Sequence, residues 1–310
     1  MYGAEKEISG ILMTNSDKSC SAEAALISSL SSRVFKYDSL HSPVSAEKRA
    51  AYINALLEGG FDVIDFGSFV SPKAIPQMAD QDKVLKMVDK TSETALLMAI
   101  VGNLRGGKDA VAQEKVDILG FPFSMSETFL QKNINSSKAK ALETIDTLAL
   151  LCADSDKELR IFMSMAFGNP YSDKWSIDEM KMQVEKFIHK GIKTITLSDT
   201  IGVATPDSIS SICYTMISDW PEIEFGLHLH TTRDGWYDKI EAAWDSGCRS
   251  FDGVLNGIGG CPMTGYDMIG NLDTLNLIKF IEDKNLPSRL NKQAILNAMF
   301  VSQELYESIN

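Results

Sequence analysis

Short runs of apolar and β-branched residues alternate along the chain with longer amphipathic segments. Runs of this kind are typical of buried strands, and the helix-like segments between them indicate that the strands are parallel. The pattern therefore predicts an α/β fold. The eight expected strands cover residues 33–38, 61–67, 95–101, 115–121, 159–165, 193–199, 224–230 and 249–255.

Two of the expected helices have clear ends in the sequence. Segments 45–60 and 176–191 each begin at a serine, a favoured N-cap residue, and each end at a glycine. Eight strand–helix repeats in about 250 residues match a (β/α)8 TIM barrel. An open doubly wound sheet is the alternative, but no G-x-G-x-x-G motif follows the first expected strand.

The two ends of the chain are expected to lie outside the barrel ring. Residues 1–30, which are rich in serine and alanine, are interpreted as an N-terminal extension, and segment 20–33 as a docking helix. Residues 31–310 form the predicted TIM-barrel domain, whose final part, 287–310, is one extra C-terminal helix.

Charge and cysteine usage narrow the classes of partner and the compartment. The formal net charge of −12 argues against a nucleic-acid or anionic membrane surface, and leaves room for an anionic small molecule in a local basic pocket. The chain has five cysteines, an odd number, and no C-x-x-C motif, which favours free thiols in a reducing compartment. The first residues lack a targeting pattern, so we expect a cytoplasmic protein. Packing is the expected role of Cys20, Cys152, Cys213 and Cys248.

Candidate chemistry gathers where strands end, which is where TIM barrels carry their active sites. Asp65 and Asp199 stand near the ends of two strands, and His228 and His230 end a third. Residues two apart in a strand point to one face, so both imidazoles are expected to reach the same space. Each histidine alone is more often structural, but this pair favours a divalent metal, Mg²⁺ or Mn²⁺, with Asn271 as an oxygen ligand.

A glycine-rich stretch, residues 256–271, holds Cys261. Glycines let the backbone turn tightly and approach a ligand closely. The alternative interpretation is a surface loop with an incidental thiol.

Several of these segments together resemble the 3-hydroxy-3-methylglutaryl-CoA lyase family. They are residues 61–80 (FDVIDFGSFVSPKAIPQMAD), 132–137 (KNINSS), 197–206 (LSDTIGVATP), 228–230 (HLH), and the GGCP and GN of the glycine-rich stretch. The similarity runs from about residue 45 to about 285. It implies a metal-dependent TIM-barrel enzyme that cleaves an acyl-CoA, 3-hydroxy-3-methylglutaryl-CoA, to acetyl-CoA and acetoacetate, a step of leucine degradation.

The resemblance also implies roles for single residues. Asp199 is the expected base for the substrate hydroxyl, and Cys261 the proton donor on a closing loop. Asp65 stands where many members have glutamate. Lys132 and Asn133 match residues that line the CoA side. The implied metal ligands are His228, His230 and Asn271.

The chain departs from the family at the end of the first strand, where the lyases have an Arg-Asp pair that serves the metal and the developing enolate. Segment 31–49 places either Val34-Phe35 or His41-Ser42 there, and its nearest carboxylate is Asp38. Arg233, from another loop, is the candidate substitute cation, and Thr231 follows the second histidine where the family usually has aspartate.

Three functions remain open after this departure. The chain is a working lyase, a relative with another acyl-CoA or hydroxy-acid substrate, or a barrel that binds a ligand without turning it over. Losing one oxyanion donor costs about a hundredfold to a thousandfold in rate, so we expect weakened lyase activity. The oligomeric state is also open, with a homodimer as the candidate assembly.

Overall fold

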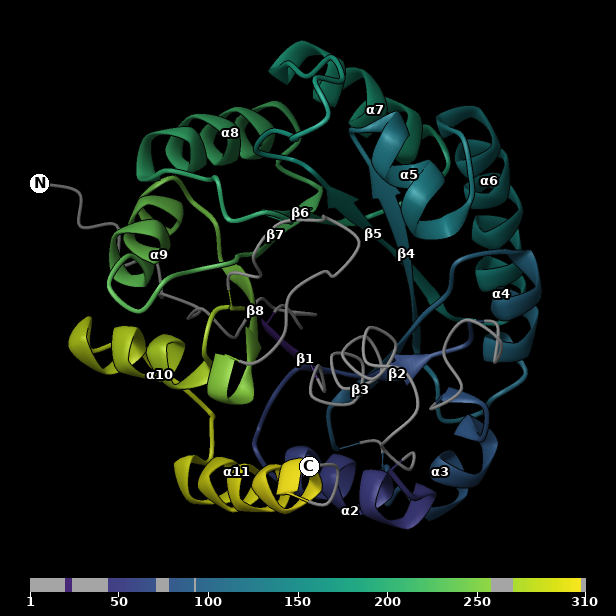
Figure 1. Cartoon of the computed structure of the whole chain (residues 1–310), viewed down its shortest axis with the longest axis vertical. Helices are drawn as coiled ribbons and strands as arrows, with labels where there is room; N and C mark the ends of the chain where they lie inside the picture. Colours follow the sequence, from purple (N-terminus) through teal and green to yellow (C-terminus); the bar gives the residue numbers. More distant parts are fainter. Residues whose placement is uncertain (1–19, 24–43, 71–77, 92, 258–269, 308–310) are drawn as a thin grey trace, which may run out of the picture.

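The computed structural model describes residues 20–23, 44–70, 78–91, 93–257 and 270–307. Its strands form one closed parallel barrel inside a ring of helices (Figure 1). The first strand pairs with the second and with the eighth, which closes the ring. The predicted TIM-barrel fold is confirmed. The strands are β1 (Cys20–Glu23), β2 (Val63–Ser68), β3 (Leu96–Ile100), β4 (Ile118–Ser124), β5 (Glu158–Ser164), β6 (Thr194–Ser198), β7 (Glu224–His228) and β8 (Ser250–Val254).

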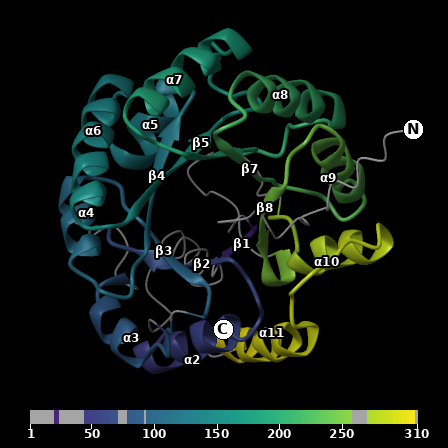
Figure 2. The ribbon, with the colours of Figure 1, turned by 180° about the vertical axis from the view of Figure 1, so that it is seen from behind.

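The helices follow the strands around the outside of the barrel, and Figure 2 shows the same ring from behind. Ser45 and Ser176 cap the two helices whose ends were predicted, by accepting hydrogen bonds from the main-chain N–H of Lys48 and Glu179. The extra C-terminal helix is also present. The described helices are α2 (Ala46–Leu57), α3 (Gln81–Met87), α4 (Leu104–Val111), α5 (Glu127–Ile134), α6 (Lys138–Asp154), α7 (Ile177–His189), α8 (Pro206–Asp219), α9 (Trp236–Asp245), the 3-10 turn η2 (Leu255–Gly257), α10 (Thr274–Asp283) and α11 (Lys292–Glu307).

The first strand differs from the sequence prediction. Strand β1 is Cys20–Glu23, inside the segment expected to form a docking helix, whereas the strand expected at 33–38 lies outside the described residues. The barrel therefore begins before residue 31. The sequence CSAE has no apolar β-branched run, and its alanine and glutamate favour helices. Its place is set instead by main-chain pairing with β2 and β8.

Large apolar side chains fill the middle of the barrel. Val63, Met98, Ile118 and Phe162, from four strands, form a buried cluster separate from the core between strands and helices. Gly120 leaves room for it, since a Cβ atom there would lie 2.9 Å from the Phe162 ring and 2.7 Å from Ile100. The centre of the barrel is thus packed, so a ligand can enter only at an end.

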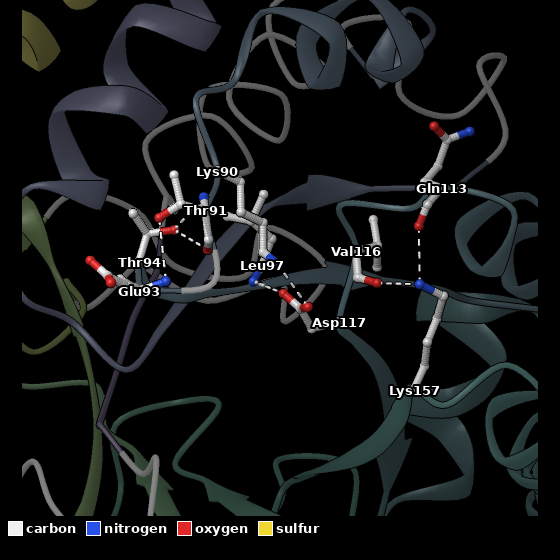
Figure 3. A network of polar contacts seen from close by, with 9 residues as sticks. All are labelled: Lys90, Thr91, Glu93, Thr94, Leu97, Gln113, Val116, Asp117 and Lys157. Atoms are coloured by element: carbon white, nitrogen blue, oxygen red, sulfur yellow. Dashed lines mark hydrogen bonds and ion pairs between the residues drawn. The ribbon is translucent and has the colours of Figure 1, made fainter.

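The N-terminal end of the barrel is held by a polar network (Figure 3). Asp117 accepts hydrogen bonds from the Leu97 main-chain N–H at 2.7 Å and from Lys90 Nζ at 2.9 Å. Lys157 Nζ donates to the carbonyl oxygens of Gln113 and Val116. These contacts tie the starts of β3, β4 and β5 together, which is a stabilising role and leaves the opposite end for chemistry.

A buried charged group lies inside the N-terminal end of the barrel, at the starts of β5 and β7. Arg160 on β5 is 1% exposed, and its Nε lies 3.7 Å from Glu158 Oε1. The Glu224 carboxylate on β7 accepts a hydrogen bond from Ser250 Oγ at 3.3 Å. Burial raises the pKa of Glu224 to about 7, although Arg160 acts in the opposite direction. The floor of the barrel therefore holds a carboxyl group that titrates near neutral pH.

The C-terminal helix lies beside the start of the ring. Helix α11 packs on α2 (Figure 1), and the Asn291 N–H just before it donates to the Gly59 carbonyl at 2.9 Å. The thiols of Cys152, Cys213 and Cys248 are free and buried, in agreement with a packing role. Among the described helices, none is long and apolar enough to cross a membrane.

Candidate active site

Two imidazoles lie together at the C-terminal end of β7. His228 is the last residue of the strand, and the ring centroids of His228 and His230 are 5.6 Å apart with an interplanar angle of 59°. His228 shares the face of its strand with Glu224, two side-chain repeats earlier. Glu224 accepts a hydrogen bond from Ser250 and is attracted electrostatically by Arg160, so this face of the strand points into the barrel. The pair therefore stands at the barrel mouth.

Asp252 on β8 orients the first imidazole. His228 and Asp252 are register partners on neighbouring strands, and Nδ1 of His228 lies 3.3 Å from Oδ2 of Asp252. The Asp252 side chain is 2% exposed. A metal-binding imidazole commonly donates its second N–H to such a carboxylate, which fixes the tautomer and the ring plane.

Main-chain hydrogen bonds tie the backbone around His230 to the segment that carries Asn271. His230 and Asn271 form an isolated antiparallel bridge. On either side of it, the Thr231 N–H donates to the Gly270 carbonyl, and the Leu272 N–H to the Leu229 carbonyl, each at 2.9 Å. Residues opposite each other in an antiparallel bridge are close side-chain neighbours. The structure thus brings Asn271 next to His230.

Asp199 follows β6 and is 1% exposed. Its Oδ1 accepts the Ala204 main-chain N–H at 3.0 Å, and its Oδ2 accepts Lys239 Nζ at 3.1 Å. Burial raises the pKa of Asp199, and the Lys239 ammonium opposes that rise. The same Lys239 Nζ donates to the His230 carbonyl at 2.9 Å.

Asp65 lies inside the barrel wall on β2. It shares a strand face with Val63, a member of the interior cluster, and is 3% exposed. Its Oδ1 accepts the Gly67 N–H at 3.1 Å, next to a register shift between β2 and β3. This contact stabilises the irregular end of the strand.

The two residues expected on the CoA side lie on α5, which follows β4. Lys132 is exposed and Asn133 half-buried, and Lys132 Nζ lies 4.3 Å from the centroid of the Tyr171 ring. Asp173 ties the Tyr171 loop to α5 by accepting hydrogen bonds from Ser126 Oγ at 2.5 Å and from the Thr128 main-chain N–H at 2.9 Å. Helix α5 and this loop are therefore fixed to each other, and together they are called the α5 wall below.

Of the remaining candidates, the structure describes Arg233 and Thr231. Arg233 is exposed, and Thr231 is buried beside the second histidine. Residues Cys261 and Asp38, and both alternatives for the Arg-Asp pair, Val34-Phe35 and His41-Ser42, lie outside the described residues.

The residues at the mouth fit part of a divalent-metal site. Two adjacent imidazoles and the amide of Asn271 supply nitrogen and oxygen donors, and Asp252 orients one imidazole in the way that metal ligands are oriented. In the part of the chain that the structure describes, no group of three or more His, Cys, Asp or Glu side chains could hold a metal.

Sequence reasoning missed two residues of this site, Asp252 and Lys239. Asp252 had a partial signal, since it shares a face with Ser250 on a predicted strand; its register opposite His228 is visible only in the structure. Lys239 had none, because a lysine on an outer helix looks like any solvated residue until the fold places it against Asp199 and His230.

Comparisons with known proteins converge on one family. Residues 38–301 match the family model described as HMGL-like. A hydroxymethylglutaryl-CoA lyase of Macaca fascicularis is 32% identical over 265 residues, covering 84% of this chain and 80% of that protein. An (R)-citramalyl-CoA lyase of Chloroflexus aurantiacus is 29% identical and covers 81% of each chain.

A solved structure adds a similarity in three dimensions. An HMG-CoA lyase from Acinetobacter baumannii, in complex with coenzyme A and 3-methylmalate, aligns with a TM-score of 0.82 and 28% identity. The alignment covers 95% of this chain and 93% of that one. The similarity thus spans the whole barrel.

Proposed function

Because the chain belongs to the HMGL-like family, we propose that it is a carbon–carbon lyase acting on a 3-hydroxyacyl-CoA. The proposed reaction cleaves 3-hydroxy-3-methylglutaryl-CoA into acetyl-CoA and acetoacetate. One observation supports it most: His228 and His230 stand together at the barrel mouth, with Asp252 behind the first and Asn271 beside the second.

The bond changes define what the site must do. The substrate loses the proton of its 3-hydroxyl, the C2–C3 bond breaks, and C3 becomes the ketone of acetoacetate. The electron pair of the broken bond passes to C2 and the thioester oxygen, which gives the enolate of acetyl-CoA. A proton delivered to C2 completes the products. The site therefore needs a base, an acid and stabilisation of negative charge.

The proposed residues meet these needs as follows. Asp199 accepts the hydroxyl proton: a carboxylate oxygen accepts more than one hydrogen bond, so Oδ2 can receive the hydroxyl while it holds Lys239. Cys261 delivers the proton to C2. Lys132 and Asn133 bind the CoA portion on the α5 wall, and Asp65 stabilises the β2 end.

His228, His230 and Asn271 would hold the divalent metal, Mg²⁺ or Mn²⁺. When bound, such an ion supplies Lewis-acid stabilisation of substrate oxygens.

A second substrate is favoured by one comparison. The relative from Chloroflexus aurantiacus is a citramalyl-CoA lyase at nearly the same identity as the hydroxymethylglutaryl-CoA lyases. Citramalyl-CoA has the same hydroxyl and thioester, and its cleavage gives acetyl-CoA and pyruvate. Both substrates need the same base and acid, so the two proposals differ only in the group attached at C3.

The test compares both thioesters on the whole chain with Mn²⁺ or Mg²⁺ present. Acetoacetate and pyruvate are measured with their specific dehydrogenases, and acetyl-CoA is measured in parallel. We expect one substrate to be cleaved, at a rate about a hundredfold to a thousandfold below that of a relative with the Arg-Asp pair. If neither is cleaved while coenzyme A and Mn²⁺ still bind, the chain is a ligand-binding barrel and the lyase proposal is wrong.

The substitute for the missing arginine can be tested in the same assay. If Arg233 supplies the lost charge, Arg233→Ala abolishes the remaining turnover. Unchanged turnover in Arg233→Ala would remove it from the site. We further propose a cytoplasmic homodimer without nucleic-acid or membrane partners, which fractionation and analytical ultracentrifugation would test.

A further inference from the structure

The side chain of Lys239, on helix α9, reaches the strand ends of the barrel. The helix lies beside α8 in the outer ring (Figure 1), and the Lys239 side chain is only 12% exposed. Its Nζ contacts two acceptors that belong to different strand ends. One is Oδ2 of Asp199, after β6, and the other is the main-chain carbonyl of His230, after β7.

The Asp199 end of this link is firmly held. The Asp199 side chain is completely buried, and its second oxygen accepts the N–H of Ala204, five residues on. The Asp199 N–H in turn donates to the His228 carbonyl at 2.9 Å. Asp199 is therefore a fixed point between the β6 loop and the end of β7, and Lys239 is its buried counter-charge.

The His230 end is held from two sides. Residues 229–231 are bonded to the segment around Asn271 through Thr231 and Leu272. Lys239, from helix α9, adds a bond to the carbonyl of His230 itself. Fixing the carbonyl limits rotation about the Cα–C bond of His230, and so limits the direction of the Cα–Cβ bond from which its ring turns.

We propose that Lys239 is a positioning residue that sets the direction of the His230 imidazole by tying its carbonyl to Asp199. The metal-affinity part of this proposal rests on the proposed function, whereas the orientation of His230 does not. Lys239 acts through other residues and is not assigned a contact with substrate. Partners behind a metal-binding imidazole typically change metal affinity by about tenfold to a hundredfold when they are removed.

The experiment uses the whole chain and the Lys239→Met variant, which keeps the length of the side chain and removes its donors. Two readouts are compared: the Mn²⁺ dissociation constant by calorimetry, and the ring signals of His230 by NMR. The chain has only four histidines, so His→Gln variants assign the signals. His189, exposed on α7, serves as the internal control.

We expect Lys239→Met to weaken Mn²⁺ binding by about tenfold to a hundredfold, and to shift the His230 signals while those of His189 stay in place. If the parent chain binds no Mn²⁺ but the His230 signals still shift, the metal part of the proposed function fails and the positioning role stands. Unchanged His230 signals in a folded variant would overturn the role of Lys239.

A second variant covers the case in which Lys239→Met does not fold, because it leaves Asp199 as a buried, unpaired charge. The Asp199→Asn/Lys239→Met double variant removes both charges and is compared with Asp199→Asn alone. We expect folding to be recovered, with the His230 signals shifted only in the double variant. Identical His230 signals in these two variants would show that the bond to the carbonyl does not orient the ring.

Discussion

Neutralising Glu224 should remove a pH-dependent cost of folding. The carboxyl group lies in the floor of the barrel, and burial raises its pKa from 4.5 to about 7. Arg160 attracts the ionised form, while Glu158 and Asp252 repel it. In Glu224→Gln, the side chain stays neutral at every pH and can still accept the hydrogen bond of Ser250 Oγ.

The size and sign follow from the two pKa values. The folded chain binds this proton more tightly than the unfolded chain. The free energy of unfolding therefore falls as pH rises from 4.5 to about 7. The difference corresponds to about 3 kcal/mol, an upper value because solvent reaches part of the side chain. Below pH 4.5 the group makes no difference, and above pH 7 the whole cost is present.

Urea unfolding of both proteins from pH 5 to pH 8 measures this cost. We expect the free energy of unfolding of Glu224→Gln to rise relative to the parent by about 1–3 kcal/mol across that range. The control is Glu222→Gln, an exposed glutamate two residues away, which should follow the parent. Parallel pH profiles for Glu224→Gln and the parent would refute the reasoning, because they would mean that Glu224 is not held neutral by burial.

Three further changes test other parts of the structure. Asp252→Asn should weaken Mn²⁺ binding by about tenfold or more, measured by calorimetry, because the amide orients His228 less firmly; unchanged binding would separate Asp252 from the site. Phe187→Ala should lower the free energy of unfolding by about 3–5 kcal/mol in urea, because the ring packs 5.1 Å from that of Phe123; a loss below about 1 kcal/mol would contradict that packing. Gly106→Ala should lower the melting temperature, because the new Cβ would lie 2.1 Å from the Phe69 carbonyl oxygen. Gly102→Ala, where the new Cβ would meet only the Ile134 side chain at 3.6 Å, controls for the exchange itself, and an unchanged melting temperature of Gly106→Ala would contradict the close approach.

The sequence predicted the parts of the fold that carry a periodic signal. Helices α2 and α7 follow from amphipathic segments with serine caps, and β2 to β8 follow from apolar runs. Strand β1 could not be predicted in this way, because pairing on both sides can place a residue run with no strand propensity.

In the candidate site too, residues related by local spacing were predicted, and residues brought together by the fold were not. The pairing of His228 with His230 follows from spacing alone, since residues two apart share a strand face. The partners Asp252 and Lys239 depend on register between strands and on the position of an outer helix. These are three-dimensional relations that one sequence does not express. The roles of Asp199, Asp65, Lys132 and Asn133 stay predictions.

The contact of α11 with α2 bears on how the chain folds during its synthesis. Helix α2 packs against α11, a helix that the ribosome makes some 240 residues later. Gly60, which follows α2 with φ of +77°, is also covered late, because Arg289 lies against it. Domains tend to fold from the N-terminus as they emerge, but here α2, the first of the described helices, is without this partner until translation is nearly over. We therefore expect a nascent chain of this protein to offer the α2 surface to chaperones through most of its synthesis.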